Sequence, residues 1–373
     1  MLIGKIPKDF DLTTNATPAQ IRKLFRNARI IGRRFKLVHI IFNREIIEVA
    51  TFRGSVVDGG SNQQINERGI LIRDNVYGTI DEDAWRRDFT LNALYYNIAD
   101  SSLIDFTGGT QDIRNKVIRI IGDPVIRYQE DPVRMLRAVR FSAKLDFIIE
   151  PQTANAIDKL HHLIQHVSGA RLFDEILKLY QCGAMESAYN LLTKHGLFAQ
   201  LFVQTVTESD ISITNEFITL AMQNTDSRVR HNQPVAPAFL FAILLWFPLK
   251  RYTLKAKETE KIPVLTALEN SMLTVIQEQN KIILIPRRFT QSMREIWLLQ
   301  FLFPKRTGAR VYNTLHHPRF RAAYDFLVLR SLVGDAPIEL AQWWTAFQEA
   351  TEQKQALMLE KIRKSTVSHA TKQ

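Results

Sequence analysis

Hydrophobic positions follow two different spacings, which divide the chain into a mixed first part and a helical remainder. Residues 35–42 and 45–52 are rich in β-branched and aromatic side chains and flank Asn43 and Arg44, which predicts two strands joined by a hairpin turn. Apolar positions at helical spacing dominate from about residue 145 onward. The pattern therefore places the strands in the first part of the chain.

Local signals mark the helices and loops. Thr17, Pro18 and Gln20 have the residue types of an N-cap, a first helical position and a capping box, and they predict a helix that begins at Pro18. Further helices are expected over 130–141, 151–160, 168–179, 184–195, 236–247, 263–281, 289–303, 317–333 and 337–363. The polar residues 54–66 predict a long loop, and residues 205–235 are expected to be less regular.

Two carboxylates lie two positions apart near the start of the chain, at Asp9 and Asp11. On a strand they would point to the same face, where Mg²⁺ could sit between them and substrate phosphates. The alternative is a solvated turn before a helix. Glu48 shares a strand face with Ile46 and Ala50. It is a candidate third metal ligand, because an unpaired glutamate is costly to bury; a solvated position on an edge strand is its alternative.

A second charged segment, Arg86-Arg87-Asp88, lies within residues 81–97, which are compatible with a helix. Asn92 follows Asp88 by four positions, so the two would share one helical face with Arg87 near them. Arginine presents a fork of donors that suits phosphate oxygens, and Asp and Asn can bond to ribose hydroxyls. A solvated face is the alternative for the arginines, but it explains poorly the apolar residues around them.

A third motif combines acids with a stripe of arginines. Glu130 and Asp131 precede Arg134, Arg137 and Arg140, which recur every three residues. Arg134 stands four positions after Glu130, a spacing at which an acid and an arginine hold one another in place on a helix. Such a pair offers donors and acceptors in register, as reading the edge of a nucleobase requires. A solvated helix face is again the alternative.

Composition narrows the class of protein. The chain has 373 residues, 46% of them hydrophobic, and a net charge of +11, which favours a polyanionic partner and nucleic acid above all. One cysteine, Cys182, excludes an internal disulfide framework and a Cys-based metal site. The most apolar run, residues 238–248, is too short to span a membrane and predicts a buried helix. We expect a cytoplasmic protein.

The three motifs, in this order, resemble the signatures of the class II template-independent nucleotidyltransferases, which comprise tRNA CCA-adding enzymes and bacterial poly(A) polymerases. The resemblance rests on residues 9–11, 86–94 and 130–141 and covers most of residues 1–200. Residues 31–40 are similar to the stretch that marks poly(A) polymerases against CCA-adding enzymes. The helical half is also similar to that of the bacterial poly(A) polymerases.

The resemblance implies an α+β fold with a polymerase-β-like nucleotidyltransferase head, a mixed sheet with helices, followed by an all-α neck and body. It implies that Asp9 and Asp11 hold two Mg²⁺ ions, that Asp88 is the third acidic residue counted with them, and that Glu48 competes for the place of third ligand. The residues implied to bind the incoming nucleotide and read its base are Arg86, Arg87, Asn92, Glu130, Asp131, Arg134 and Arg137. The expected domains are the head over 1–122, the neck over 123–200 for base and RNA binding, and the body over 201–373 for RNA binding.

One departure from the family pattern concerns the start of the chain. In the family a strand, a Gly-Gly turn and a helix precede the two aspartates, and that turn grips the triphosphate. This chain begins at Met1, within what corresponds to the end of that helix. We therefore expect a head that lacks its first strand, and weak or no polymerase activity from residues 1–373 alone.

The implied function is transfer of AMP from ATP to RNA 3′ ends by a two-metal mechanism, a polyadenylation that promotes RNA decay. The implied partners are ATP, the 3′ ends of mRNA, small RNA and tRNA, and RNA-decay proteins, with no membrane. Two alternatives remain open. One is a CCA-adding tRNA nucleotidyltransferase, and the other is a truncated, inactive RNA-binding protein.

Overall fold

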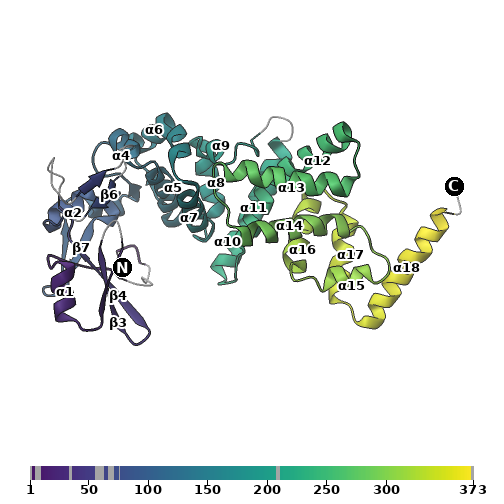
Figure 1. Ribbon diagram of the computed structural model, residues 1–373, viewed down its shortest axis with the longest axis horizontal. Coiled ribbons are helices and arrows are strands. Elements are labelled where there is room, and N and C mark those ends of the chain that lie inside the picture. Colours follow the sequence, from purple (N-terminus) through teal and green to yellow (C-terminus); the bar gives the residue numbers. More distant parts are fainter. Residues whose placement is uncertain are drawn as a thin grey trace. The chain divides into compact units, whose positions relative to one another are not determined.

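The computed structural model describes residues 2–4, 10–32, 36–54, 63–65, 71–74, 76–206 and 211–370 (Figure 1). The chain divides into two compact units. The head unit comprises residues 1–134 and 146–156, and the helical unit comprises residues 135–145 and 157–373. A mixed sheet in the head unit and helices in the other confirm the predicted α+β class.

A four-stranded sheet forms one part of the head unit. Its strands are β1 (Leu12–Thr14), β2 (Ala28–Ile31), β3 (Leu37–Phe42) and β4 (Glu45–Thr51), in the order β1-β4-β3-β2. β1 pairs with β4 in parallel, and the other two pairs are antiparallel. The hairpin expected between residues 35 and 52 is confirmed. Asn43 takes a φ of +52° in its turn, in the left-handed region that asparagine tolerates.

Helix α1 (Pro18–Leu24) covers the buried face of this sheet. The predicted helix start is confirmed, because Thr17 and Gln20 form a reciprocal capping box. Ile21 packs into a core with Val38, Ile40 and Val49. Burial of these side chains fixes which face of the sheet is solvated: the alternate positions of β4, including Glu48, lie on the other face.

The rest of the head unit joins short strands and helices. These are β5 (Gln63–Ile65), β6 (Leu71–Asp74), α2 (Ile80–Arg86), the 3₁₀ turn η1 (Thr90–Asn92), β7 (Leu94–Asn97), β8 (Ser102–Asp105), α3 (Gly109–Arg114), β9 (Val117–Ile118), α4 (Pro124–Glu130) and β10 (Ile148–Ile149). The continuous helix expected over residues 81–97 is wrong. That segment is a helix, a 3₁₀ turn and a strand paired with β8, because Tyr95 on β7 and Ala93 after the turn are buried together with Ala84 of α2 and not along a helical stripe.

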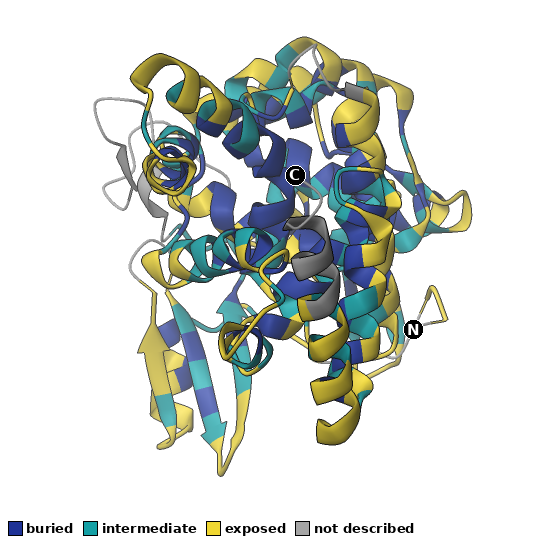
Figure 2. Cartoon of the chain, turned by 90° about the vertical axis from the view of Figure 1, so that its right-hand side faces the viewer, coloured by how far each residue is buried: buried dark blue, intermediate teal, exposed yellow. Residues whose placement is uncertain are grey.

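Helices make up the second unit. After α5 (Val133–Leu145) and α6 (Pro151–Leu160), where the two units meet along the chain, come η2 (His161–His166), α7 (Gly169–Tyr180), α8 (Met185–Lys194), α9 (Leu197–Leu201), α10 (Ile211–Arg230), α11 (Pro237–Leu244), α12 (Trp246–Glu260), α13 (Val264–Asn280), α14 (Arg287–Leu302), α15 (Arg310–Leu315), α16 (Phe320–Leu332), α17 (Ile338–Glu349) and α18 (Glu352–Ala370). Buried positions form the inner faces of these helices in Figure 2. The less regular segment expected over residues 205–235 is instead largely α10, a helix whose charged and polar residues weaken its apolar stripe.

The apolar run at residues 238–248 is buried as expected apart from half-buried Phe239, but it is divided between α11 and the start of α12 and is not one helix. Trp246, Trp297 and Trp344 lie among the largest fully buried side chains of this unit. In the described part of the chain no helix combines the length and the apolar character that crossing a membrane requires.

Candidate active site

The Arg86-Arg87-Asp88 segment leaves the end of α2 and turns into η1. The Asp88 Oδ1 atom accepts hydrogen bonds from the Phe89 backbone N–H at 2.9 Å and from Asn92 Nδ2 at 3.1 Å. Asp88 and Asn92 are therefore in contact, as their spacing suggested, but through a 3₁₀ turn. Arg86 donates to the backbone carbonyl of Gly54.

Asp83, which lies one turn before Arg87 in α2, is only 3% exposed. Its Oδ2 accepts from the Tyr95 hydroxyl at 2.6 Å and from Arg87 Nε and Nη2 at 3.2 and 3.1 Å. Its Oδ1 accepts from the backbone N–H and the Nε of Arg53, at 3.1 and 3.2 Å. Burial alone would raise the pKa of Asp83, but the Tyr95 hydroxyl and the charges of Arg87 and Arg53 hold that pKa below its usual value.

These contacts fix the Arg87 guanidinium. Besides its two bonds to Asp83, its Nε lies 3.1 Å from the Tyr95 hydroxyl and its Nη1 donates to the Asn92 carbonyl at 3.1 Å. Burial and the hydrogen bond to Asp83 raise the pKa of the Tyr95 hydroxyl, which therefore stays protonated and can donate. Asp83 and Tyr95 thus hold Arg87 in one orientation beside Asn92.

The Glu130-Asp131 motif occupies the junction between α4 and α5, and not the single helix expected over residues 130–141. Asp131 is the C-cap of α4, and its Oδ1 accepts from the Val133 N–H at 3.3 Å. Arg134 Nη1 nevertheless donates to Glu130 Oε2 at 2.9 Å, so the acid and the arginine are paired as their spacing predicted. Glu130 is exposed, which leaves carboxylate surface available to a ligand.

Arg127 joins the second and third motifs. Its Nη2 donates to the backbone carbonyls of Arg86 and Arg87 at 3.0 and 2.6 Å, and its Nη1 donates to Glu130 Oε2 at 2.9 Å. Arg134 Nη1 in turn donates to the Arg127 carbonyl at 2.7 Å. Burial, together with the charge of Arg134, lowers the pKa of Arg127. One guanidinium therefore holds the end of α2 against the start of α5.

Neither Asp83 nor Arg127 was singled out from the sequence. The signal for Arg127 was present, since it stands three positions before Glu130 and seven before Arg134, in line with the arginine stripe. The carbonyls of residues 86 and 87 that it contacts lie 41 and 40 positions away along the chain, so these contacts have no local signal. Arg137 lies one turn beyond Arg134 in α5, with its guanidinium carbon 5.4 Å from the centre of the Phe141 ring.

A second ionic cluster, centred on Asp112, contacts η1 through Thr90. Thr90 Oγ1 donates to Asp112 Oδ2 at 2.7 Å, and Arg119 joins Asp112 at 3.1 Å to Glu150 at 3.4 Å. Gly109, at the start of α3, packs so closely here that an added Cβ would lie 2.2 Å from the Thr90 carbonyl oxygen. A glycine is therefore required at 109 by the approach of the two backbones.

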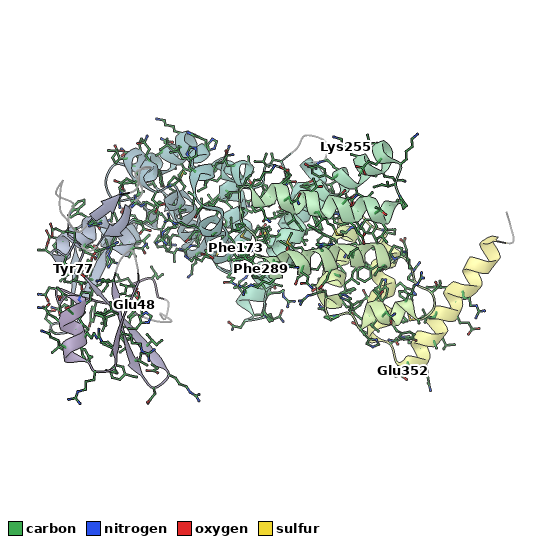
Figure 3. The ribbon with its side chains drawn as sticks, in the orientation of Figure 1. Glu48, Tyr77, Phe173, Lys255, Phe289 and Glu352 are labelled. Atoms are coloured by element: carbon green, nitrogen blue, oxygen red, sulfur yellow. The ribbon has the colours of Figure 1, made fainter. Side chains whose placement is uncertain are left out.

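Of the candidate metal ligands Asp9, Asp11 and Glu48, the structure describes the last two. Asp9 lies outside the described residues. Asp11 is exposed and directly precedes β1, and Glu48 is half-buried in the inner strand β4, so the edge-strand alternative for Glu48 is wrong. Glu48 Oε2 lies 3.3 Å from His39 Nε2 on β3 (Figure 3 labels Glu48 in the sheet). Over the described ranges, no three His, Cys, Asp or Glu side chains are grouped so that they could hold a metal ion.

Comparison with known proteins assigns the family. Three family models match. The poly A polymerase head domain matches residues 1–119. The probable RNA and SrmB-binding site of polymerase A matches residues 146–207, and the polymerase A arginine-rich C-terminus matches residues 260–373. Poly(A) polymerase I of Salmonella typhimurium is 46% identical over 370 residues, which cover 97% of this chain and 80% of the relative. This chain belongs to the bacterial poly(A) polymerase family.

The length of the sequence match distinguishes the poly(A) polymerase family from the CCA-adding alternative. The CCA-adding enzyme of Bacillus subtilis is 36% identical over 195 residues, only 52% of this chain and 47% of that enzyme. Among solved structures, the Bacillus stearothermophilus CCA-adding enzyme in complex with CTP aligns with a TM-score of 0.55 at 24% identity, covering 98% of this chain and 75% of that one. Poly(A) polymerases and CCA-adding enzymes thus share this fold, while the whole-length sequence match is to the former.

Proposed function

We propose that this chain is a polynucleotide adenylyltransferase that adds AMP from ATP to RNA 3′ ends without a template. The observation that carries the proposal is its 46% identity, across nearly the whole chain, to a poly(A) polymerase I. The head unit adds a physical argument, because Arg127 joins a segment suited to phosphate and ribose to one suited to a base edge.

The Arg87 side of the site is suited to the sugar and phosphates of ATP. Its guanidinium is held by Asp83 and Tyr95 before any substrate arrives, so little side-chain freedom would be lost on binding a phosphate oxygen. Asp88 and Asn92 present a carboxylate and an amide that match the donor and acceptor of a ribose hydroxyl. In this proposal Arg86, Arg87, Asp88 and Asn92 bind the nucleotide.

The Glu130–Arg134 pair is suited to the base. Adenine presents an amino donor next to a ring-nitrogen acceptor, and a carboxylate beside a guanidinium presents the complementary acceptor and donor. Glu130, Asp131, Arg134 and Arg137 are the proposed base-reading residues. Cytosine also presents an amino donor, so CTP is the informative competitor in any test of selectivity.

The carboxylate oxygens near the start of β1 are suitable ligands for a hard divalent cation. Leu12 pairs with Val49, and Asp11 and Glu48 are the residues just before them, so the two carboxylates come from neighbouring strands at the same level. We propose that Asp9 and Asp11 hold Mg²⁺, with Glu48 or Asp88 as the third acidic residue. Bound Mg²⁺ would supply Lewis-acid activation of the RNA 3′-hydroxyl and neutralise triphosphate charge.

The proposed domains are a head over residues 1–122, a neck over 123–200 and a body over 201–373. The limits of the matched families, which fall at 119, 146, 207 and 260, support a division of this kind. RNA 3′ ends in the cytoplasm are the proposed acceptors, the neck and body are proposed to hold the RNA, and RNA-decay proteins are proposed partners. The net charge of +11 supports a polyanionic acceptor.

The test is extension of a labelled RNA by the full chain with Mg²⁺ and one NTP at a time. The proposal predicts long tails with ATP alone, whereas the departure from the family pattern before Asp9 predicts weak or no extension, so the extent of tailing decides between these two expectations. Products that stop after C, C and A, or equal use of CTP, would contradict the proposal in favour of a CCA-adding enzyme. RNA binding without extension would favour the inactive form, and Asp11→Ala should abolish extension while leaving RNA binding nearly unchanged.

A further inference from the structure

A cavity with a volume of about 710 Å³ lies within the helical unit. It is enclosed by residues of α10, α11, α14 and α16 together with the end of α7, so one compact unit supplies all of its described walls. Its walls include Tyr180, Arg228, Phe239, Arg288, Phe289 and Arg321. This volume is in the range of pockets that hold a small organic ligand and exceeds what a simple anion needs.

The charge of the lining is strongly positive. Four arginines line the cavity, and Asp325 is the only acidic residue among the described lining. Asp325 is already paired with Arg321 at 3.1 Å, and Arg319 is paired with Glu295 at 3.2 Å. Burial raises the pKa of Asp325, which further limits the negative charge that this carboxyl brings to the cavity.

Within the part of the chain that the structure describes, Arg228 and Arg288 lack an ion-pair partner of this kind, although the charge of Arg228 also acts on Asp325. Among the described residues neither forms an ion pair: Arg228 Nε and Nη2 donate to the Pro234 carbonyl at 3.2 and 3.0 Å, and Arg288 lies over the Phe289 ring at 4.7 Å. A guanidinium held by a carbonyl or a ring keeps its full charge and further donors. The cavity is therefore complementary to an anion at these two residues.

The rest of the wall is aromatic. Phe289 and Phe239 are both half-buried. The Phe289 ring is tilted against the Phe173 ring with 5.5 Å between ring centres, and the Phe239 ring lies edge-on to the Phe326 ring at 6.1 Å. Figure 3 shows Phe173 and Phe289 side by side. Each ring is thus fixed by a neighbour and still lines the cavity. Fixed rings next to arginines are the combination on which nucleobases stack while their phosphates are held.

We propose that this cavity is a second nucleotide-binding site, in which Arg228 and Arg288 bind phosphate and Phe239 and Phe289 contact the base. The occupant is a nucleotide, either free or as one residue of an RNA strand, since both present the same phosphate and base. The site extends the proposed function, because its residues lie in the helical unit and none belongs to the motifs of the head. It does not depend on the catalytic roles assigned there.

The test is photocrosslinking of the full chain with 8-azido-AMP and, separately, with an oligo(A) that carries one 8-azidoadenosine. Peptides containing residues 224–239 and 288–296 should be labelled. Labelling of these peptides by AMP identifies a free-nucleotide site, and labelling by the oligonucleotide alone identifies an RNA contact. Either result supports the proposal, and absence of label from these peptides with both probes overturns it.

Variants make the test specific. The double variant Arg228→Gln, Arg288→Gln should lower the labelling of the peptides at residues 224–239 and 288–296, here called the body label, at least about tenfold, because two charge-assisted contacts are lost. The matched control is Lys255→Gln with Arg363→Gln, which removes the same charge from exposed positions outside the lining (Figure 3 labels Lys255, far from Phe289). Ser292→Phe fills the cavity without changing its charge and should also reduce the label. Equal labelling of all variants, or equal loss in the control, would contradict the proposal.

Adenylate transfer to a short primer, measured on the same proteins, reports on the head. Loss of body labelling in the variants tests the second site alone. Failure of the unaltered chain to use ATP, with body labelling retained, would count against the proposed function and leave the second site standing.

Discussion

At the scale of single residues, two side chains outside the motifs organise the candidate active site. Asp83 receives donors from Arg53, Arg87 and Tyr95, and Arg127 donates to the backbone that carries Arg87. Neither is proposed to touch the substrate. Both are positioning residues, so their loss should change nucleotide binding through Arg87 and the proposed base-reading pair, Glu130 and Arg134.

Replacing Asp83 with Asn removes the charge that two arginines share. Breaking a buried ionic cluster from one side typically costs about 3 kcal/mol, because the remaining charges stay buried and unpaired. We expect a loss of that order in the free energy of urea unfolding and a higher KM for ATP. Asp81→Asn, at an exposed position of the same helix, is the control. Equal stability of the two variants would show that Asp83 is not the centre of this cluster.

The same residue predicts a dependence on pH. The pKa of Asp83 is lowered in the folded protein, so its stabilisation is present above the ordinary pKa of aspartate, about 4, and is lost as pH falls through the lower folded value. The unfolding free energy of the unaltered protein should therefore fall more steeply below pH about 4 than that of Asp83→Asn. Parallel curves from urea titrations between acidic and neutral pH would contradict this assignment.

Arg127→Lys keeps the positive charge but replaces the planar set of guanidinium N–H donors with a single ammonium group. An ammonium cannot bridge the carbonyls of residues 86 and 87 and the Glu130 carboxylate in the same geometry. Hydrogen bonds to charged groups contribute about 1.5–3 kcal/mol, so kcat/KM for ATP should fall about 10- to 100-fold. Arg114→Lys, exposed at the end of α3, should leave the rate unchanged. A similar rate for both variants would mean that Arg127 does not position the site.

At the scale of elements, the strand-to-helix turn before α3 supports the 3₁₀ turn that carries Asn92. Asp105 accepts from the N–H groups of Gly108, Gly109 and Thr110 at 2.9, 3.0 and 2.8 Å, which ends β8 and starts α3. Burial would raise the pKa of Asp105, but the bonds from Thr110 and the turn amides lower it. The turn thereby brings Gly109 against η1.

The two glycines of this turn should differ in tolerance. Gly109→Ala places a Cβ 2.2 Å from the Thr90 carbonyl oxygen and should force η1 to move, lowering both the thermal midpoint and nucleotide affinity. Gly108 has a φ of +80° and open space around it, so Gly108→Asn should cost well under the roughly 1–2 kcal/mol of a strained residue. The reverse order of stabilities would show that backbone conformation, and not contact, sets the requirement.

Sequence patterns predicted elements well where local chemistry decides them. The capping box at Thr17, the hairpin at Asn43 and the Glu130–Arg134 pair are confirmed, because each depends on residues within a few positions of one another. The helix predicted over 81–97 is wrong because the pairing of Tyr95 with β8 and its burial against Ala84 of α2 override helical spacing. The contacts of Asp83 with Arg53 and of Arg127 with residues 86 and 87 are tertiary, so no local pattern could show them.

At the scale of the whole molecule, the net charge of +11 lies almost entirely in the helical unit, which holds 29 of the 49 lysines and arginines but only 19 of the 38 acidic residues. Basic side chains that contact phosphates release the counterions of the nucleic acid when it binds. The arginines of the helical cavity are one place where such contacts are expected.

RNA affinity should therefore fall linearly with salt on logarithmic axes. Each phosphate contact with a single strand contributes about −0.7 to the slope, so removing Arg228 and Arg288 together should reduce the steepness by about 1.4. Fluorescence anisotropy of labelled oligo(A) over a range of salt concentrations measures it. The paired substitution of Lys255 and Arg363 provides the comparison, and an unchanged slope in the cavity variant would exclude RNA phosphate as the ligand of its arginines.

The bonds from Arg127 to the chain at residues 86 and 87 end on carbonyl oxygens, which every amino acid possesses. The link to Glu130 therefore does not depend on the side chain at either position, but the Arg87 side chain also pairs with buried Asp83, so position 86 is the one that can be exchanged. If the proposed roles of Arg86 and of the Glu130–Arg134 pair hold, triphosphate affinity and base preference are separately adjustable. A library randomised at position 86 could be selected for unnatural triphosphates while the proposed preference for adenine is inherited from the unaltered half of the site.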